Sequence, residues 1–147
     1  MLVVSDASNP PFPGESSVIT IGAYDGLHLG HQTVIREVRR QAEERGARAA
    51  VVTFDRHPAD IVRPESAPRL LTDHEQRLEL FEATGVDAAV VLPFDEAQSQ
   101  EPALSFIERV LVKCLNTTLI VVGVDFHFGR NREGNVALLR EVGATYG

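Results

Sequence analysis

Short apolar runs alternate with longer amphipathic stretches along most of the chain. Four runs are almost uniformly apolar and are bounded by Gly, Pro or Asp, which is typical of strands buried on both faces. They occupy residues 18–21, 49–54, 88–92 and 119–123. The first 17 residues are polar and rich in proline, and they predict a loose arm or a short edge strand around residues 2–4.

Helical periodicity fills the segments between these runs. After the first run, one helical face carries apolar residues and a glycine stands where helices commonly end. The residues are Val34, Ile35, Val38 and Ala42 on that face, and Gly46 at the end. The segment 60–71 contains two prolines and is expected to be a long connecting loop.

Three further helices are expected. A capping box at 72–75 opens a helix that carries Leu78, Phe81 and Ala83 and ends at Gly85. Pro102 fits the first turn of the next helix. Its inward residues are Phe106, Ile107, Val110, Leu111 and Cys114, and Cys114 is expected to be inert core. A final amphipathic helix spans 135–142 and ends at Gly143.

Strands that alternate with helices predict an α/β fold, a Rossmann-like open parallel sheet with helices on both faces. Residues 18–147 are expected to form one domain, with residues 1–17 as the arm or edge strand. Ligands of such sheets bind at the carboxyl ends of the strands. The segments that follow the four predicted strands are 22–31, 55–58, 93–95 and 123–129.

Composition narrows the classes of function. The net charge is −7, with a sequence pI near 5.2, so the chain lacks the basic character of nucleic-acid-binding domains. No apolar run is long enough to predict a membrane span, and the first residues do not resemble a secretory signal. The single Cys114 excludes an intramolecular disulfide framework and any zinc site built from several cysteines. A cytoplasmic location is therefore expected.

The densest chemical signal is Gly22-Ala-Tyr-Asp-Gly-Leu-His-Leu-Gly-His31, between the first strand and the first helix. Two imidazoles, His28 and His31, lie where free backbone N–H groups and the helix dipole favour an anion. Gly30 between them lets a ligand approach the backbone. The pattern is neither a G-x-G-x-x-G fingerprint nor a Walker A loop.

Two other interpretations of this segment remain open. The histidines could be ordinary solvated residues at the start of a helix. Alternatively, they could bind zinc if Asp25 or His57 supplied a third ligand.

The motif G-x-x-D-G-x-H-x-G-H resembles that of the nucleotidyltransferase superfamily, in which H-x-G-H binds a nucleoside triphosphate. Further segments are similar to the FAD synthetase (FMN adenylyltransferase) module of prokaryotic bifunctional riboflavin kinase/FAD synthetase. They are V-T-F-D-R-H-P at 52–58, R-L-L-T at 69–72, G-V-D at 85–87, V-L-P-F-D at 91–95 and V-G-V-D-F-H-F-G-R at 122–130. The resemblance extends from about residue 18 to the end of the sequence.

This resemblance implies the site. ATP and its phosphates would be bound by Gly22, Tyr24, Asp25, Gly26, His28, Gly30 and His31, with His28 and His31 as the catalytic residues. The flavin would be bound by His57, Pro58, Asp125, Phe126 and Phe128. Mg²⁺ would be held through the phosphates, without an assigned side-chain ligand.

The implied reaction is adenylyl transfer from ATP to FMN, giving FAD and pyrophosphate. The family module continues into an I-S-S-T-x-I-R-like segment and then into a riboflavin kinase domain, and this sequence is expected to lack both. Activity could therefore be impaired. Two alternatives remain: a nucleotidyltransferase that acts on another phosphorylated acceptor, and a fragment that binds nucleotide or flavin without catalysis. Ala23 and Tyr24 stand where the family more often has Asn and Phe.

Overall fold

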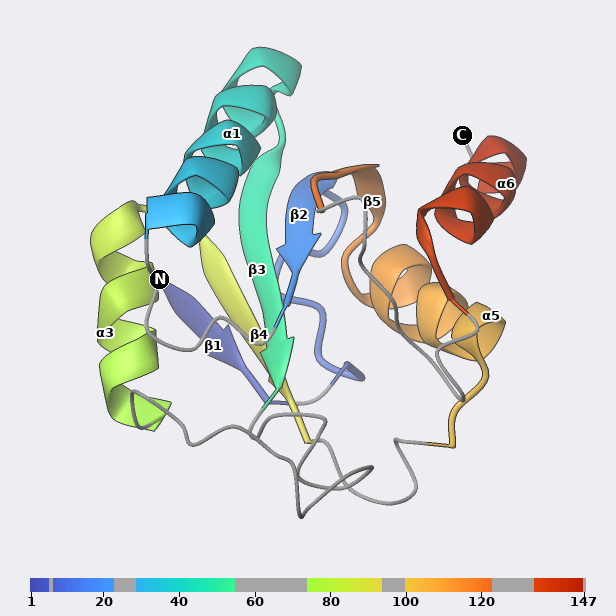
Figure 1. The fold of residues 1–147 in the computed structure, drawn as a ribbon, viewed down its shortest axis with the longest axis horizontal. Helices are drawn as coiled ribbons and strands as arrows, with labels where there is room; N and C mark the ends of the chain where they lie inside the picture. Colours follow the sequence, from blue (N-terminus) through green and yellow to red (C-terminus); the bar gives the residue numbers. More distant parts are fainter. Residues whose placement is uncertain (6, 23–28, 55–73, 94–99, 123–133, 147) are drawn as a thin grey trace.

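Five parallel strands form one sheet in the order β1-β4-β3-β2-β5 (Figure 1). The strands are β1 (Leu2–Val4), β2 (Ser17–Ile21), β3 (Arg48–Phe54), β4 (Ala88–Leu92) and β5 (Thr117–Ile120). The computed structural model describes residues 1–5, 7–22, 29–54, 74–93, 100–122 and 134–146. The order confirms the predicted α/β fold with a parallel sheet. Of the two forms expected for the first residues, an arm or an edge strand, residues 2–4 form the edge strand β1.

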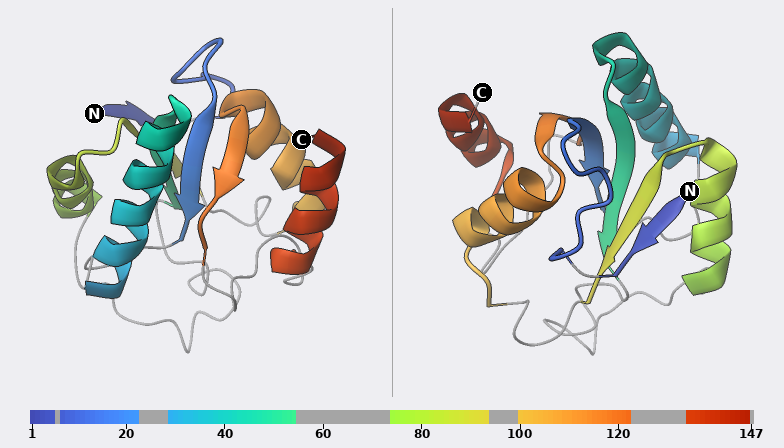
Figure 2. Two further views of the ribbon diagram at one scale, coloured as in Figure 1. Left: turned by 90° about the horizontal axis from the view of Figure 1, so that it is seen from above. Right: turned by 180° about the vertical axis from the view of Figure 1, so that it is seen from behind.

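Helices cover both faces of the sheet (Figures 1 and 2). One face carries α1 (Leu29–Arg45) and α3 (His74–Thr84). The other carries α5 (Ala103–Phe106), the π-helix η2 (Ile107–Cys114) and α6 (Val136–Tyr146). Helices pack on both faces because the strands carry apolar side chains on both faces, and each face must be shielded from water.

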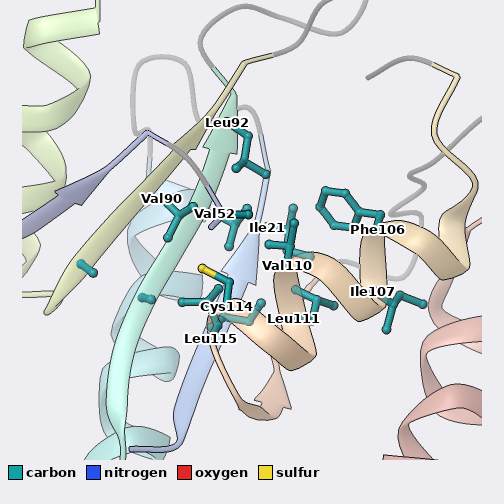
Figure 3. Packing of buried hydrophobic residues seen from close by; sticks show 14 of the residues in the cluster. Ile21, Val52, Val90, Leu92, Phe106, Ile107, Val110, Leu111, Cys114 and Leu115 are labelled. Atoms are coloured by element: carbon teal, nitrogen blue, oxygen red, sulfur yellow. The ribbon is translucent and has the colours of Figure 1, made fainter. Parts of the chain in front are cut away.

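Alternation along each strand divides the core into two clusters. Ile19 and Val52 point into the cluster beneath η2, whereas Val18 and Val51 point into the cluster beneath α1. Figure 3 shows the first cluster, in which Cys114 lies among strand and helix side chains. Cys114 is 4% exposed, which confirms the prediction of a core cysteine.

Two glycines end helices as predicted. Gly46 follows α1 with a φ of 64°, and Gly85 follows α3 with a φ of 83°. Both values lie in the left-handed region that glycine adopts without a steric penalty. Within α3, Phe81 is fully buried and Leu78 is half-buried, but Ala83 is exposed and does not belong to the packed face.

Two predicted boundaries were wrong, and one helix has a geometry that was not predicted. The fourth apolar run was expected to be a buried strand over 119–123; β5 instead spans Thr117–Ile120 and is only half-buried, because it is an edge strand. The last helix does not end at Gly143 but continues to Tyr146, since an exposed glycine inside a helix costs only about 1 kcal/mol. The helix after Pro102 changes to π geometry at Ile107, for which the sequence carries no local signal.

Candidate active site

The strand order has its switch point at β2. From β2 the chain passes through α1 to β3 and through α3 to β4 on one face of the sheet, and it then returns along the other face to β5. β2 therefore lies between β3, which follows it in the sequence, and β5, which is reached last. In open α/β sheets, ligands bind outside the carboxyl ends of the strands at such a point.

Gly22, the first residue of the histidine motif, lies directly beyond β2. Its N–H donates a hydrogen bond of 3.0 Å to the carbonyl of Val52, so the pairing of β2 with β3 continues one residue past the strand. β3 itself ends two residues later, at Phe54. The segments that follow these two strands therefore start side by side at the carboxyl end of the sheet.

The N-terminus of α1 also lies at the carboxyl end of the sheet, because α1 follows β2 and packs back against the sheet. The helix begins at Leu29, which places Gly30 and His31 in its first turn. That turn contains no acidic residue, so nothing in it opposes an anion at the free backbone N–H groups. Ile35 and Val38, both buried, hold α1 against the cluster that includes Val18.

A network of charged side chains lies further along α1, away from the carboxyl end of the sheet. Arg40 contacts Glu37 at 2.6 Å and Glu44 at 2.7 Å, and Gln41 donates to Glu37 at 2.9 Å. The hydrogen bonds from Arg40 and then Gln41 lower the pKa of Glu37 to about 2. Arg40 and Glu44 are exposed, whereas Glu37 and Gln41 are half-buried, and ion pairs this accessible to water contribute little to stability.

Most of the predicted site residues lie outside the residues that the structure describes. They are Tyr24, Asp25, Gly26, His28, His57, Pro58, Asp125, Phe126 and Phe128. Gly22, Gly30 and the backbone of His31 are described, and they lie at the edge and helix end that the sequence predicted. Of the candidate zinc ligands, Asp25, His28 and His57 belong to this set, and only the backbone of His31 is described.

The topology nevertheless relates the predicted phosphate and flavin segments to each other. The histidine motif follows β2, the segment with His57 follows β3, and the segment with Asp125 follows β5. These three strands are direct neighbours in the sheet, with β2 in the middle. All three segments therefore follow the carboxyl ends of three neighbouring strands.

Sequence reasoning missed the role of Asp87. Its carboxylate accepts a hydrogen bond of 2.9 Å from the N–H of Ala49, while its own N–H donates to the carbonyl of Ala49 at 2.8 Å. This reciprocal pair joins the start of β3 to the residue before β4. Asp87 is the last residue of the G-V-D segment at 85–87, and its side chain contributes to strand pairing.

Sequence reasoning also missed an open groove of about 630 Å³ along β5, between α1 on one face and η2 and α6 on the other.

Within the described ranges, no three His, Cys, Asp or Glu side chains gather as a metal site would require. Within the same ranges, no helix has the length and apolar character that crossing a bilayer demands.

The chain matches the family model described as FAD synthetase over residues 13–147. It is 35% identical over 133 residues to a bifunctional riboflavin kinase/FMN adenylyltransferase of Haemophilus influenzae, covering 90% of this chain and 43% of that protein. The protein of the same name in Escherichia coli K12 is 34% identical over 135 residues, with 92% and 43% covered. A putative one in Geobacillus thermodenitrificans is 40% identical over 124 residues, with 84% and 66% covered.

The chain thus spans about half the length of the curated relatives that it matches. Among solved structures, a macrolide-efflux protein from Streptococcus pneumoniae superimposes with a TM-score of 0.78 at 23% identity. The superposition covers 95% of this chain and 46% of the macrolide-efflux protein chain. At this identity the match concerns the fold alone.

Proposed function

We propose that this chain, which belongs to the FAD synthetase family, transfers the adenylyl group of ATP to FMN. The observation that carries the proposal is the family match over residues 13–147, because that range contains every motif quoted for the site. The relatives at 34–35% identity are named FMN adenylyltransferases, and their matched regions cover 90% or more of this chain.

The reaction needs no nucleophile from the protein. A phosphate oxygen of FMN attacks the α-phosphorus of ATP, and the bond from that phosphorus to the bridging oxygen breaks. FAD forms and pyrophosphate leaves with the electron pair. The protein contributes positioning of the two phosphates and stabilisation of the charge that develops between them.

His28 and His31 are the proposed catalytic residues. His31 lies in the first turn of α1, and His28 precedes that helix by one residue. Imidazole N–H groups and the backbone N–H groups of a helix start are hydrogen-bond donors suited to phosphate. Gly22, Tyr24, Asp25, Gly26 and Gly30 would shape the loop around the triphosphate.

The flavin half of the site is proposed to flank this loop. His57 and Pro58 follow β3, and Asp125, Phe126 and Phe128 follow β5. Because β2 lies between those strands, the phosphate loop would be the centre of the cleft and the flavin residues its two sides. In this arrangement the FMN phosphate would lie toward the histidines.

Mg²⁺ is proposed to enter with ATP. The first turn of α1 offers N–H donors and no carboxylate, which fits an ion held by phosphate oxygens and water rather than by this helix. When bound, the ion would supply charge neutralisation on the phosphates. FMN and FAD are the substrate and product, and a riboflavin kinase domain is the proposed neighbour, since the named relatives are bifunctional.

The test is an acceptor comparison that monitors pyrophosphate release with ATP and Mg²⁺. FMN should support release, whereas riboflavin, which lacks the attacking phosphate, should not. Turnover with another phosphate monoester but not with FMN would assign a different nucleotidyltransferase. Binding of FMN or ATP by calorimetry without any release would assign a binding module.

A further inference from the structure

Two threonine hydroxyl groups are buried in the sheet close to the candidate site. Thr20 is 0% exposed and Thr53 is 1% exposed, and they stand one residue before the ends of β2 and β3. These are the strands that lead into the histidine motif and into the segment with His57. On β4, the residue opposite Thr53 is the buried Val91. The core therefore contains polar side chains where β2 and β3 approach the candidate site.

Packing alone does not require a hydroxyl group at these positions. Valine has nearly the same shape as threonine, and a buried hydroxyl group is costly unless it is hydrogen-bonded. Each of the two threonines has an interaction partner in the structure. Ser17, at the opposite end of β2, is a buried hydroxyl group with a structural role, because it donates a hydrogen bond of 2.6 Å to the carbonyl of Leu115.

Both threonines lie on the face of the sheet that α1 covers. Side chains alternate along a strand, and Val18 and Val51, two residues earlier in each strand, belong to the cluster beneath α1. Thr20 is opposite Val51 in the register of the two strands, so Thr53 lies one step further toward the carboxyl end on the same face. The two threonines are therefore diagonal neighbours beneath α1.

The helical repeat of α1 leads from this cluster to a catalytic candidate. α1 runs opposite to the strands (Figure 2), and Ile35 packs in the same cluster as Val51. One turn before Ile35 on that face of the helix is the position of His31, about 6 Å closer to the carboxyl end of the sheet. Two residues of a strand span about 6.6 Å, so the step from Val51 to Thr53 has nearly the same length and direction.

The orientation of an imidazole ring decides whether it can serve a phosphate. A neutral imidazole has one N–H donor and one acceptor nitrogen, and the hydrogen bond made by one nitrogen sets which of them carries the proton. For the ring to donate to a phosphate, its other nitrogen must accept a hydrogen bond. A threonine hydroxyl group can donate that bond, whereas a backbone carbonyl cannot.

We propose that the hydroxyl groups of Thr20 and Thr53 position the imidazole of His31, a role that rests on the proposed function of that histidine. A hydroxyl group donates to the ring nitrogen that faces the sheet, so the other ring nitrogen carries the proton and presents it to a phosphate. Both threonines are positioning residues, because they act through His31 and do not touch the substrates.

The first test measures the tautomer of His31 by ¹⁵N NMR of the ring nitrogens, at a pH where imidazole is neutral. The signals of His31 are those that His31→Ala removes. In the unsubstituted chain His31 should populate one tautomer. Thr20→Val combined with Thr53→Val removes both hydroxyl groups and should give a mixture of tautomers. Thr20→Ser combined with Thr53→Ser keeps both hydroxyl groups and should preserve the single tautomer.

The second test is the pyrophosphate assay with the same variants. The double valine variant should lower kcat about five- to tenfold, as expected for the loss of one hydrogen bond, with little change in KM for ATP or FMN. Its melting temperature should not fall, because valine fills the same space. Ser17→Ala is the matched control, since it removes a buried hydroxyl group at the far end of β2. It should lower the melting temperature and leave both the tautomer and kcat unchanged.

A single tautomer of His31 in the double valine variant would overturn the proposal. A mixture of tautomers in the unsubstituted chain would do the same. If the double variant does not fold, the two single valine variants are compared in its place, and a single tautomer in both would also overturn it. The NMR comparison contains no substrate, so a failure of the unsubstituted chain to release pyrophosphate with FMN would count against the proposed function and not against this positioning.

Discussion

Gly85 is held in a conformation that other residues rarely adopt. With a φ of 83°, it ends α3, and a Cβ at this position would lie 2.9 Å from Cζ of Arg39 on α1. Gly85→Ala should destabilise the chain by about 1–2 kcal/mol, because alanine pays for the left-handed backbone and displaces Arg39. Thermal or urea unfolding measures the change.

Gly143 provides the opposite case as a control. It lies inside α6, and a Cβ there would meet nothing within 4 Å. Gly143→Ala should therefore stabilise the chain by about 0.5–1 kcal/mol, through the better helix propensity of alanine. Equal effects of the two variants would contradict the assigned conformations.

The two histidines of the motif are predicted to act on the chemical step. His28→Ala and His31→Ala should each lower kcat roughly 10²–10³-fold, by analogy with the loss of one preorganised donor to an oxyanion. Because both side chains are proposed to face the bound ligand rather than the core, stability should change by no more than about 0.5 kcal/mol. The assay is pyrophosphate release at saturating FMN, ATP and Mg²⁺, with melting curves alongside. Near-normal kcat, or unfolding, in both variants would assign the histidines a structural role.

His57 should act on the acceptor instead. If it lines the flavin side of the cleft, His57→Ala should weaken the binding of FMN more than that of ATP, because it follows β3 and not β2. Calorimetry with each ligand separately measures the two losses. An equal or larger loss of ATP affinity would remove His57 from the flavin side.

At the level of elements, Phe81 is the fully buried side chain of α3 among those that the structure describes. Phe81 is fully buried against the cluster that includes Ile35 and Val38, whereas the adjacent Leu80 is 37% exposed. Phe81→Ala should cost about 3–5 kcal/mol, through lost burial and the cavity left behind. Leu80→Ala, the neighbouring control, should cost no more than about 1 kcal/mol. Comparable losses in chemical unfolding would show that α3 packs through a different face.

The sequence predicted those elements best that are buried on both faces. β2, β3 and β4 lie inside the sheet, so almost every residue is apolar and the pattern identifies them within a residue. β5 was predicted two residues late because it begins with Thr117 and Thr118. Thr118 donates to the carbonyl of Ser17, and the register shifts beside Ser17, features that only the paired strand creates.

The position of the candidate site in the fold could be predicted from the sequence, whereas its geometry could not. Parallel strands all end on the same side of the sheet, so the order of the motifs already predicted that the Gly22 and His57 segments begin at its carboxyl end. Which strands are neighbours could not be predicted, since order depends on which face each crossover takes. The groove along β5 was also hidden, because residues 119–122 read as ordinary core.

For the molecule as a whole, catalysis is predicted to depend on chain length. The phosphate-binding segment that the family resemblance implies would follow α6, so a polypeptide that stops at residue 147 should bind adenine nucleotide more weakly than one that includes this segment. The longest product of the reading frame should have a higher kcat in the pyrophosphate assay. The same product with His28→Ala gives the background rate. Equal turnover of both lengths would show that the additional segment is dispensable.

The central position of β2 also has a consequence for the time course of synthesis. Ser17 at the start of β2 donates to the carbonyl of Leu115, 98 residues away, and pairs with β5 only through such distant contacts. At about 5–20 residues per second, a ribosome takes roughly 5–20 s to produce that stretch. During this interval the nascent chain presents one side of an apolar strand without its partner, so this edge is where chaperones and premature aggregation would compete with folding.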